Sequence, residues 1–128
     1  MFENLEIFQM AHGMAKHAGA RQTVIAQNVA NADTPDYVAK DIEPFRSFYE
    51  TSGQPVHQRA TRVSHLNGVM DQQLYPMNER QTGPSDPNGN SVSIESEMLH
   101  AVDTKRQHDR ATMIYKSALT ILRTAVQR

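Results

Sequence analysis

Residues 28–42 read NVANADTPDYVAKDI, and this stretch indicates where a long N-terminal helix ends and the chain turns back. Asn28 and Asn31 are three residues apart, so they share one face of a helix. Their amides both donate and accept hydrogen bonds, so they can bridge the last helical carbonyls and the chain beyond the helix. Pro35 ends the helix, because a proline pushes the residue before it towards extended geometry.

The remaining polar residues of the stretch offer the groups that hold a turn. Asp33 and Thr34 form local side-chain hydrogen bonds to the backbone in many turns, and Tyr37 supplies an apolar body with a polar tip. An ordinary solvated helix end accounts for the same residues, so this alternative stays open. The predicted turn residues are Asn28, Asn31, Asp33, Thr34, Pro35 and Tyr37.

Upstream of the turn, residues 4–32 carry a thin apolar stripe with helical spacing. Its members recur at intervals of three, four or seven residues, which is close to a heptad period. They are Ile7, Ala11, Met14, Ala18, Ile25 and Val29. Small side chains in this stripe favour close approach of a second helix.

A second long helix is predicted over residues 92–127. Ser91 or Ser93 can cap its start, and Glu95 and Glu97 lie in the first turn, where the helix dipole favours acids. Its second half is apolar over more than half of its circumference. A helix of this kind must be covered on more than one side, which one partner helix cannot do.

The middle of the chain, residues 36–91, has a different composition. It holds the prolines other than Pro35 and the loop-like segment TGPSDPNGN at residues 82–90. Residues 60–63 and 69–75 are the segments that favour a strand or a brief helix. The predicted fold is therefore mainly α, with two long terminal helices paired as a coiled-coil-like hairpin and an irregular or short β-hairpin middle. The predicted divisions are 1–35, 36–91 and 92–128.

Composition excludes several classes of protein. Leu, Ile, Val and Phe together make up 25 of 128 residues, which is too few for a large self-contained core. The net charge of −1 argues against nucleic acid as the main partner. The N-terminus shows no cleavable signal peptide, and no run of 18 apolar residues predicts a membrane span.

Catalytic and metal chemistry find little support in the residue pattern. The six histidines show no i, i+4 pair, and the chain has no cysteine. No glycine-rich elbow surrounds a serine, and Gly83 and Gly89 belong to turns rather than to a phosphate loop. We therefore predict no catalytic residue, no metal site, no cofactor and no small-molecule substrate.

The motif N-x-x-N-A-D-T-P-x-Y-x-A-x-D-I, following a long helix, resembles the flagellar basal-body rod protein family. Residues 61–68 (TRVSHLNG), 89–98 (GNSVSIESEM) and 115–125 (YKSALTILRTA) are similar to later segments of that family. The resemblance thus covers nearly the whole chain. One departure is Asp36, because the family usually has glycine after the proline.

The resemblance implies a structural subunit rather than an enzyme. Its terminal helices would line the inner tube of the flagellar rod, and it would reach the periplasmic basal body through type III export. Implied partners are further copies of the chain, FlgC-like rod subunits, a FliE-like adaptor, and the export gate with the MS ring. Direct membrane insertion is not implied.

The helical stripes predict the assembly face of such a subunit. Two alternatives stay open: a soluble helical-hairpin adaptor that binds one partner helix, and another rod subunit such as FlgC. The predicted assembly face is Ile7, Met14, Ile25, Val29, Ile114, Tyr115, Ala118, Leu119, Leu122 and Val126.

Overall fold

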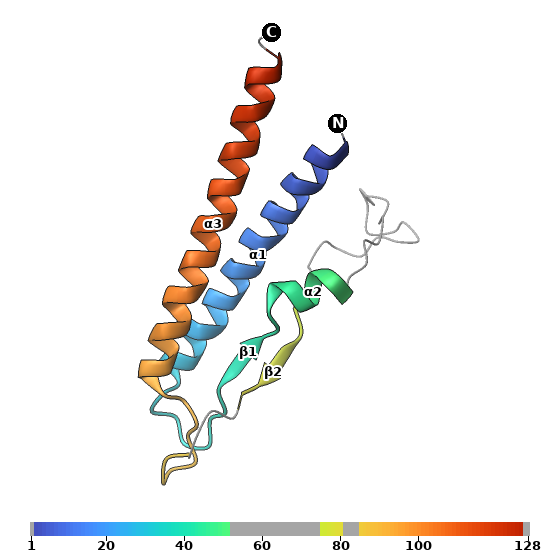
Figure 1. Cartoon of the computed structure of the whole chain (residues 1–128). Coiled ribbons are helices and arrows are strands. Elements are labelled where there is room, and N and C mark those ends of the chain that lie inside the picture. The colour runs from blue at the N-terminus through green and yellow to red at the C-terminus, as the bar shows by residue number, and fades with distance from the viewer. Residues whose placement is uncertain (1, 52–74, 81–84, 127–128) are drawn as a thin grey trace, which may run out of the picture.

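Two long antiparallel helices make up most of the molecule. The computed structural model describes residues 2–51, 75–80 and 85–126. Helices α1 (Phe2–Ala30) and α3 (Ile94–Val126) pack together, and the two chain ends lie at the same end of the pair (Figure 1). The predicted mainly helical hairpin is confirmed.

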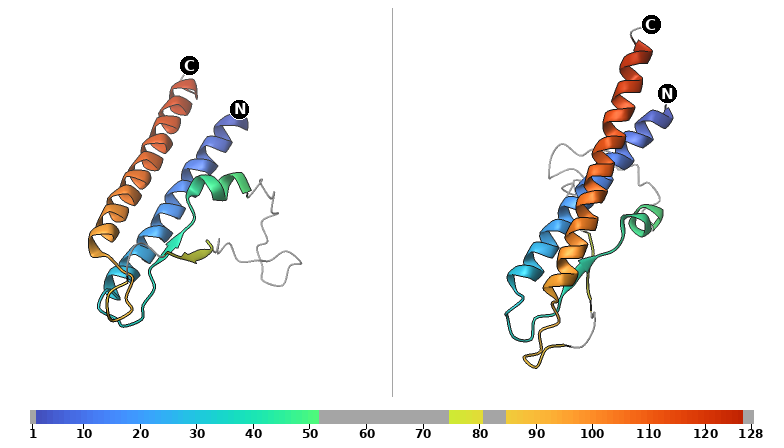
Figure 2. Two further views of the ribbon diagram at one scale, coloured as in Figure 1. Left: turned by 60° about the horizontal axis from the view of Figure 1, so that its bottom comes forward. Right: turned by 60° about the vertical axis from the view of Figure 1, so that its left-hand side comes forward.

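The middle of the chain adds a small sheet and a short helix beside α1. Strand β1 (Lys40–Ile42) pairs antiparallel with β2 (Met77–Glu79), with Asp41 opposite Asn78, and α2 (Phe45–Thr51) follows β1 directly. The views in Figure 2 show the sheet and α2 lying to one side of the helix pair. The segments 60–63 and 69–75, predicted as a strand or brief helix, lie outside the described residues except for Tyr75, which is in neither a helix nor a strand.

Buried residues at heptad spacing form the seam between the two long helices. The rings of Phe8 and Tyr115 are 5.1 Å apart, which shows the antiparallel register of α1 and α3. In each helix, buried residues recur at intervals of seven, which keeps one stripe facing the partner helix. These residues are Ala11, Ala18 and Ile25 on α1, and Glu97, Thr104 and Ala111 on α3.

The interior is unusually polar for a helical protein. The largest fully buried side chains are all polar or ionisable: His17, Glu97, Asn28, Asn90 and Thr104. Burying such groups is costly unless each finds a hydrogen-bond partner. The fold therefore depends on how these side chains are paired.

The turn between α1 and β1 contains a strained residue. Asp36 has a φ of +59°, in the left-handed region that favours glycine, and its N–H donates to the carbonyl oxygen of Asn88 at 3.1 Å. A Cβ atom at Gly89 would collide with the Asp36 carboxylate. The residue that departs from the family pattern thus occupies a position with a glycine-like backbone.

We predict that Asp36→Gly raises the free energy of unfolding by about 1 kcal/mol, because glycine adopts positive φ without the Cβ penalty. Urea denaturation measures the change. Asp33→Gly is the control, because Asp33 lies in the same turn without a positive φ. It should lower the stability instead, and a lower stability for Asp36→Gly would contradict the strain argument.

Candidate functional site

The side chain of Asn28 sits at the point where α1, β1 and α3 meet. Its Nδ2 donates to the carbonyl oxygen of Lys40 at 2.7 Å and to Oε2 of Glu97 at 3.1 Å. Its Oδ1 accepts from the Lys40 N–H at 3.0 Å and from the Tyr37 hydroxyl at 3.3 Å. A primary amide has two donor hydrogens and two acceptor lone pairs. Asn28 uses all four while fully buried.

Asn90, in the segment before α3, binds the turn that follows α1. Its Nδ2 lies 3.0, 2.8 and 2.7 Å from the carbonyl oxygens of Asn31, Ala32 and Thr34. Its Oδ1 accepts from the Val92 N–H at 2.7 Å. The carbonyls at a helix C-terminus have no partner within the helix. Asn90, from the segment that leads into α3, satisfies those beyond the end of α1.

An alternating row of charges lies next to Asn28 and is joined to it through Glu97. Arg21 donates from Nε and Nη2 to the two carboxylate oxygens of Asp41, at 2.9 and 2.8 Å. Arg80 donates to the same carboxylate at 2.9 Å and also to Glu97, which is 1% exposed. Two cations and two anions balance, so the burial of each charge is compensated by its neighbours. The row joins α1, β1, the residue after β2, and α3.

The neighbouring charges in the row shift the pKa values of Asp41 and Arg21. Burial alone would raise the pKa of Asp41. The hydrogen bonds and charge of Arg21, the Ile42 N–H and the charge of Arg80 outweigh it and hold the pKa below its ordinary value. The hydrogen bond to Asp41 raises the pKa of Arg21. Both groups therefore stay ionised over the whole neutral range.

The remaining turn residues lie nearer the surface than Asn28 does. Asn31 donates from Nδ2 to the carbonyl oxygen of Gln27 at 2.8 Å, and its Oδ1 accepts from the Thr34 hydroxyl at 3.2 Å. Tyr37 reaches Asn28 with its hydroxyl. Asp33 and Pro35 are exposed. The structure thus brings Asn28 and Tyr37 together, while Asn31 and Thr34 form a separate local contact.

Asn28, Asn90 and the row of charges form a polar junction between the two long helices and the sheet. Sequence reasoning placed Glu97 only in the first turn of the second helix, and it assigned no role to Arg21, Asp41, Arg80 and Asn90. Asp41, Asn90 and Glu97 all lie within the motif segments quoted above, and Asp41 directly precedes the buried Ile42. That placement was the available signal. Arg21 and Arg80 carry no such signal, because each is an ordinary arginine in a polar neighbourhood of the sequence.

The predicted assembly residues fall into three groups. Ile25 is 3% exposed and holds the two helices of its own chain together, so it is not available to a neighbour. Ile7, Val29, Tyr115 and Val126 are exposed to solvent, although the ring of Tyr115 also touches Phe8. The half-buried residues are Met14, Ile114, Ala118, Leu119 and Leu122.

Further apolar side chains of α3 lie exposed outside that predicted set. Ile94, Met98 and Val102 form one row at i, i+4 and i+8. Met113 and Ile121 are 70% and 61% exposed farther along the same helix, and Ile121 lies about 100° around the helix axis from Val102. Several sides of α3 therefore present apolar surface that α1 does not cover.

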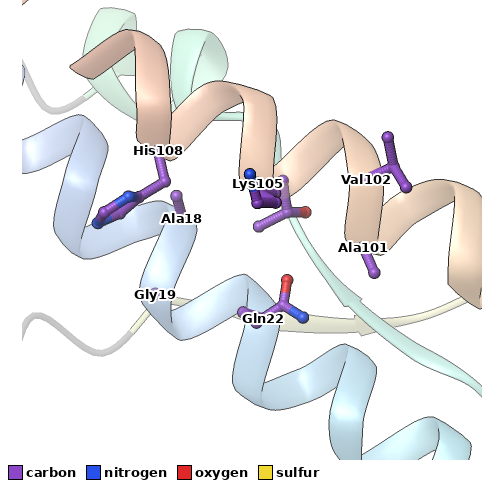
Figure 3. Close-up of a pocket in the computed structure, with 8 residues that line it drawn as sticks. Ala18, Gly19, Gln22, Ala101, Val102, Lys105 and His108 are labelled. Carbon is purple, nitrogen blue, oxygen red and sulfur yellow. The ribbon is translucent and has the colours of Figure 1, made fainter. Parts of the chain in front are cut away.

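A groove of about 470 Å³ runs between α1 and α3 (Figure 3). Ala18, Gly19 and Ala101 form much of its lining, with Lys105 and His108 as its ionisable residues. It offers no paired acid and base and no nucleophile with a partner, which a hydrolytic or transfer site requires. Its small side chains instead match a surface for helix contact.

Neither a metal centre nor a membrane span is evident within residues 2–51, 75–80 and 85–126. No three of the His, Cys, Asp and Glu side chains in these ranges are grouped to hold a metal ion. None of the helices there combines the length and apolarity that crossing a bilayer requires.

Comparison with known proteins identifies the family. The chain is 31% identical to the flagellar basal body rod protein FlgB of Agrobacterium fabrum (strain C58) over 129 aligned positions, which cover 97% of this chain and 95% of that protein. The chain belongs to the FlgB family of flagellar basal body rod proteins. No general family model matches the sequence.

Membership of the FlgB family agrees with the resemblance drawn from the sequence motifs. Among the rod subunits considered, the A-D-T-P form of the turn and the C-terminal pattern favour FlgB over FlgC. The buried junction also places two residues of the motif, Asn28 and Asp41, at the contact between the two long helices and the sheet.

We predict that Asn28→Asp lowers the free energy of unfolding by roughly 3–5 kcal/mol. The change keeps the shape of the side chain but removes both donor hydrogens and places a carboxylate against Glu97. Asn31→Asp is the matched control. It alters a residue that makes only local contacts in the turn, and it should cost about 1 kcal/mol. Equal losses in urea denaturation would contradict the central role of Asn28.

Acid should weaken the fold through Asp41. The unfolded chain binds a proton to this carboxylate near pH 3.8, whereas the folded chain does so at lower pH. Stability contributed by Asp41 is therefore fully present above about pH 3.8 and is lost as the pH falls below it. Asp41→Asn should be less stable at pH 7 and should show a flatter decline between pH 5 and pH 2. Urea midpoints measured across that range check this, and an unchanged acid slope would contradict it.

Proposed function

We propose that this protein is a structural subunit of the bacterial flagellar basal-body rod, most similar to the proximal rod protein. The observation that carries the proposal is the near full-length likeness to FlgB of Agrobacterium fabrum. The exposed apolar residues of α3 support it, because a subunit in a polymer needs surfaces for more than one neighbour. The role is structural rather than enzymatic.

The surface of α3 also weighs against the alternative of an adaptor that binds a single helix. Such an adaptor needs one narrow apolar stripe, as in helix-in-groove recognition. Here Met98 and Ile121 are both exposed, and at 3.6 residues per turn they lie on sides of the helix about 140° apart around its axis. Packing among neighbouring subunits would cover all of these sides at once.

The remaining parts of the proposal concern route and partners. The chain is exported by the flagellar type III apparatus and assembles in the periplasmic basal body by helix packing, where it is needed for flagellar assembly and motility. Its neighbours are other rod subunits, including copies of itself and FlgC-like proteins, together with a FliE-like adaptor, the export gate and the MS ring.

The direct test is genetic complementation. The gene is deleted in its own bacterium, and the unsubstituted chain is supplied from a plasmid. Basal bodies are then examined by electron microscopy, and swimming is scored in soft agar. The deletion should remove the rod and hook, and the chain should restore both. Normal rods in the deletion strain would overturn the proposed function.

Substitutions on α3 test the assembly surface in the same strain. We predict that Ile121→Asp and Val102→Asp each abolish rod formation and motility. Their side chains are 61% and 48% exposed in the subunit. Unfolding free energies should therefore stay within about 0.5 kcal/mol of the parent chain.

Thr120→Asp is the matched control for these variants. It introduces the same charge beside Ile121 at an exposed polar position. It should fold and support swimming. Motility in the Ile121→Asp and Val102→Asp strains would show that these positions of α3 are not part of an assembly surface. Loss of motility in the control would show that an added charge, rather than the loss of an apolar side chain, disrupts assembly.

A further inference from the structure

A single histidine lies beneath the connection between β1 and α2. The imidazole of His17, on α1, is completely buried. Its Nε2 lies 2.7 Å from the carbonyl oxygen of Glu43, so Nε2–H donates to the backbone of that connection. The rings of Phe45 and Tyr75 meet the imidazole edge-on, with centroids 5.6 and 5.1 Å away. The imidazole is thus enclosed by three segments of the chain.

Within the described parts of the chain, the surroundings of His17 offer no hydrogen-bond acceptor for a second proton on the imidazole. The Nδ1 atom is buried and has no hydrogen-bond partner among the residues that the structure describes. A proton there would create a buried N–H donor and a buried charge, both of which are costly without a partner. Neutral imidazole with hydrogen on Nε2 is the form that fits.

The charged groups around the site do not compensate an imidazolium. Arg21, one helical turn along α1, adds a like charge, while Asp41 on β1 is the nearby anion. Both oxygens of Asp41 already accept from Arg21, Arg80 and the Ile42 N–H. Helix α2 presents the uncharged ring of Phe45, and the segment before β2 presents the phenol ring of Tyr75.

These surroundings fix the direction of the proton linkage. Burial lowers the pKa of His17 below its ordinary value of 6.5. The charge of Arg21 adds to this effect, against the Glu43 hydrogen bond and the charge of Asp41. A chain with the connection open binds a proton near pH 6.5, whereas the closed form does so only at lower pH. Closure therefore weakens as the pH falls from 6.5 towards the lowered pKa.

The attachment of α2 to α1 is slight compared with that of α3. Helix α2 has seven residues, too few to be stable alone, and the ring of Phe45 rests over Gly13 and His17. The seam between α1 and α3 uses other residues, including Ala18, Thr104 and Ala111. Releasing the connection leaves that seam in place.

We propose that His17 is a proton-operated latch: its neutral imidazole holds the β1–α2 connection against α1, and protonation releases that connection while the α1–α3 hairpin stays paired. Release exposes Phe45 and the Gly13–His17 surface of α1. The latch is a property of the subunit itself and does not depend on the proposed role in the rod.

Hydrogen exchange measured by mass spectrometry tests the latch in the full chain between pH 8 and pH 5, after correction for intrinsic exchange rates. Protection of residues 43–51 should fall as the pH drops below 6.5, by at most about tenfold per pH unit, and should level off below the lowered pKa of His17. Protection within α1 and α3 should not change over the same range.

Two variants separate His17 from other titrating groups. His17→Gln can still donate to the Glu43 carbonyl but takes no proton, so the protection of residues 43–51 should be independent of pH. His12→Gln is the control, because His12 is exposed on the same helix and should behave as the parent chain does. An equal pH dependence in His17→Gln would overturn the latch, as would simultaneous loss of protection in α1 and α3.

The parent chain also gives a test without substitution. The NMR signals of the His17 ring should titrate below pH 6.5, and the ring signals of Phe45 should shift over the same range. An ordinary titration of His17 near pH 6.5 with unmoved Phe45 signals would overturn the proposal, even if His17→Gln failed to fold.

Discussion

The fully paired amide of Asn28 is the constraint on which the rest of the structure depends. It binds Lys40 as a neighbouring strand would, through both the N–H and the carbonyl oxygen, and it reaches Glu97 on the opposite helix. Because the side chain is fully buried, a rearrangement that breaks one of these bonds leaves an unpaired group away from water. The side chain of Asn28 therefore links the end of α1, the start of β1 and the first turns of α3.

The polar junction also explains how a chain with few large apolar residues maintains a defined fold. Half of the buried apolar side chains in the described residues are alanines, namely Ala11, Ala18, Ala39 and Ala111. Small residues let the helices approach closely but bury little area, so they contribute little to the free energy of unfolding. Paired charges and amides add less net stability than an apolar core of the same size, but they accept only one arrangement. The junction therefore contributes chiefly by selecting one geometry.

Many of the large apolar side chains instead lie exposed on the surface of α3. A soluble monomer gains nothing from exposing Met98, Leu99, Met113 and Ile121. In a polymer of FlgB-type subunits, the same residues would lie between helices of adjacent copies. In such a polymer, the buried polar residues would hold the hairpin together, and the exposed apolar residues of α3 would bind its neighbours. Folding and assembly would then depend on different residues.

The sequence by itself determined the two long helices, because hydrophobic periodicity and helix-ending signals are local properties of the chain. The Asn28–Tyr37 motif and the missing glycine at residue 36 were also visible there. Only the tertiary structure decided which polar residues meet, since Arg21, Asp41, Arg80 and Glu97 are far apart in sequence and show no shared period. It likewise placed Ile25 inside the hairpin and Ile121 outside it. Burial depends on which helix faces which, and periodicity alone does not specify that choice.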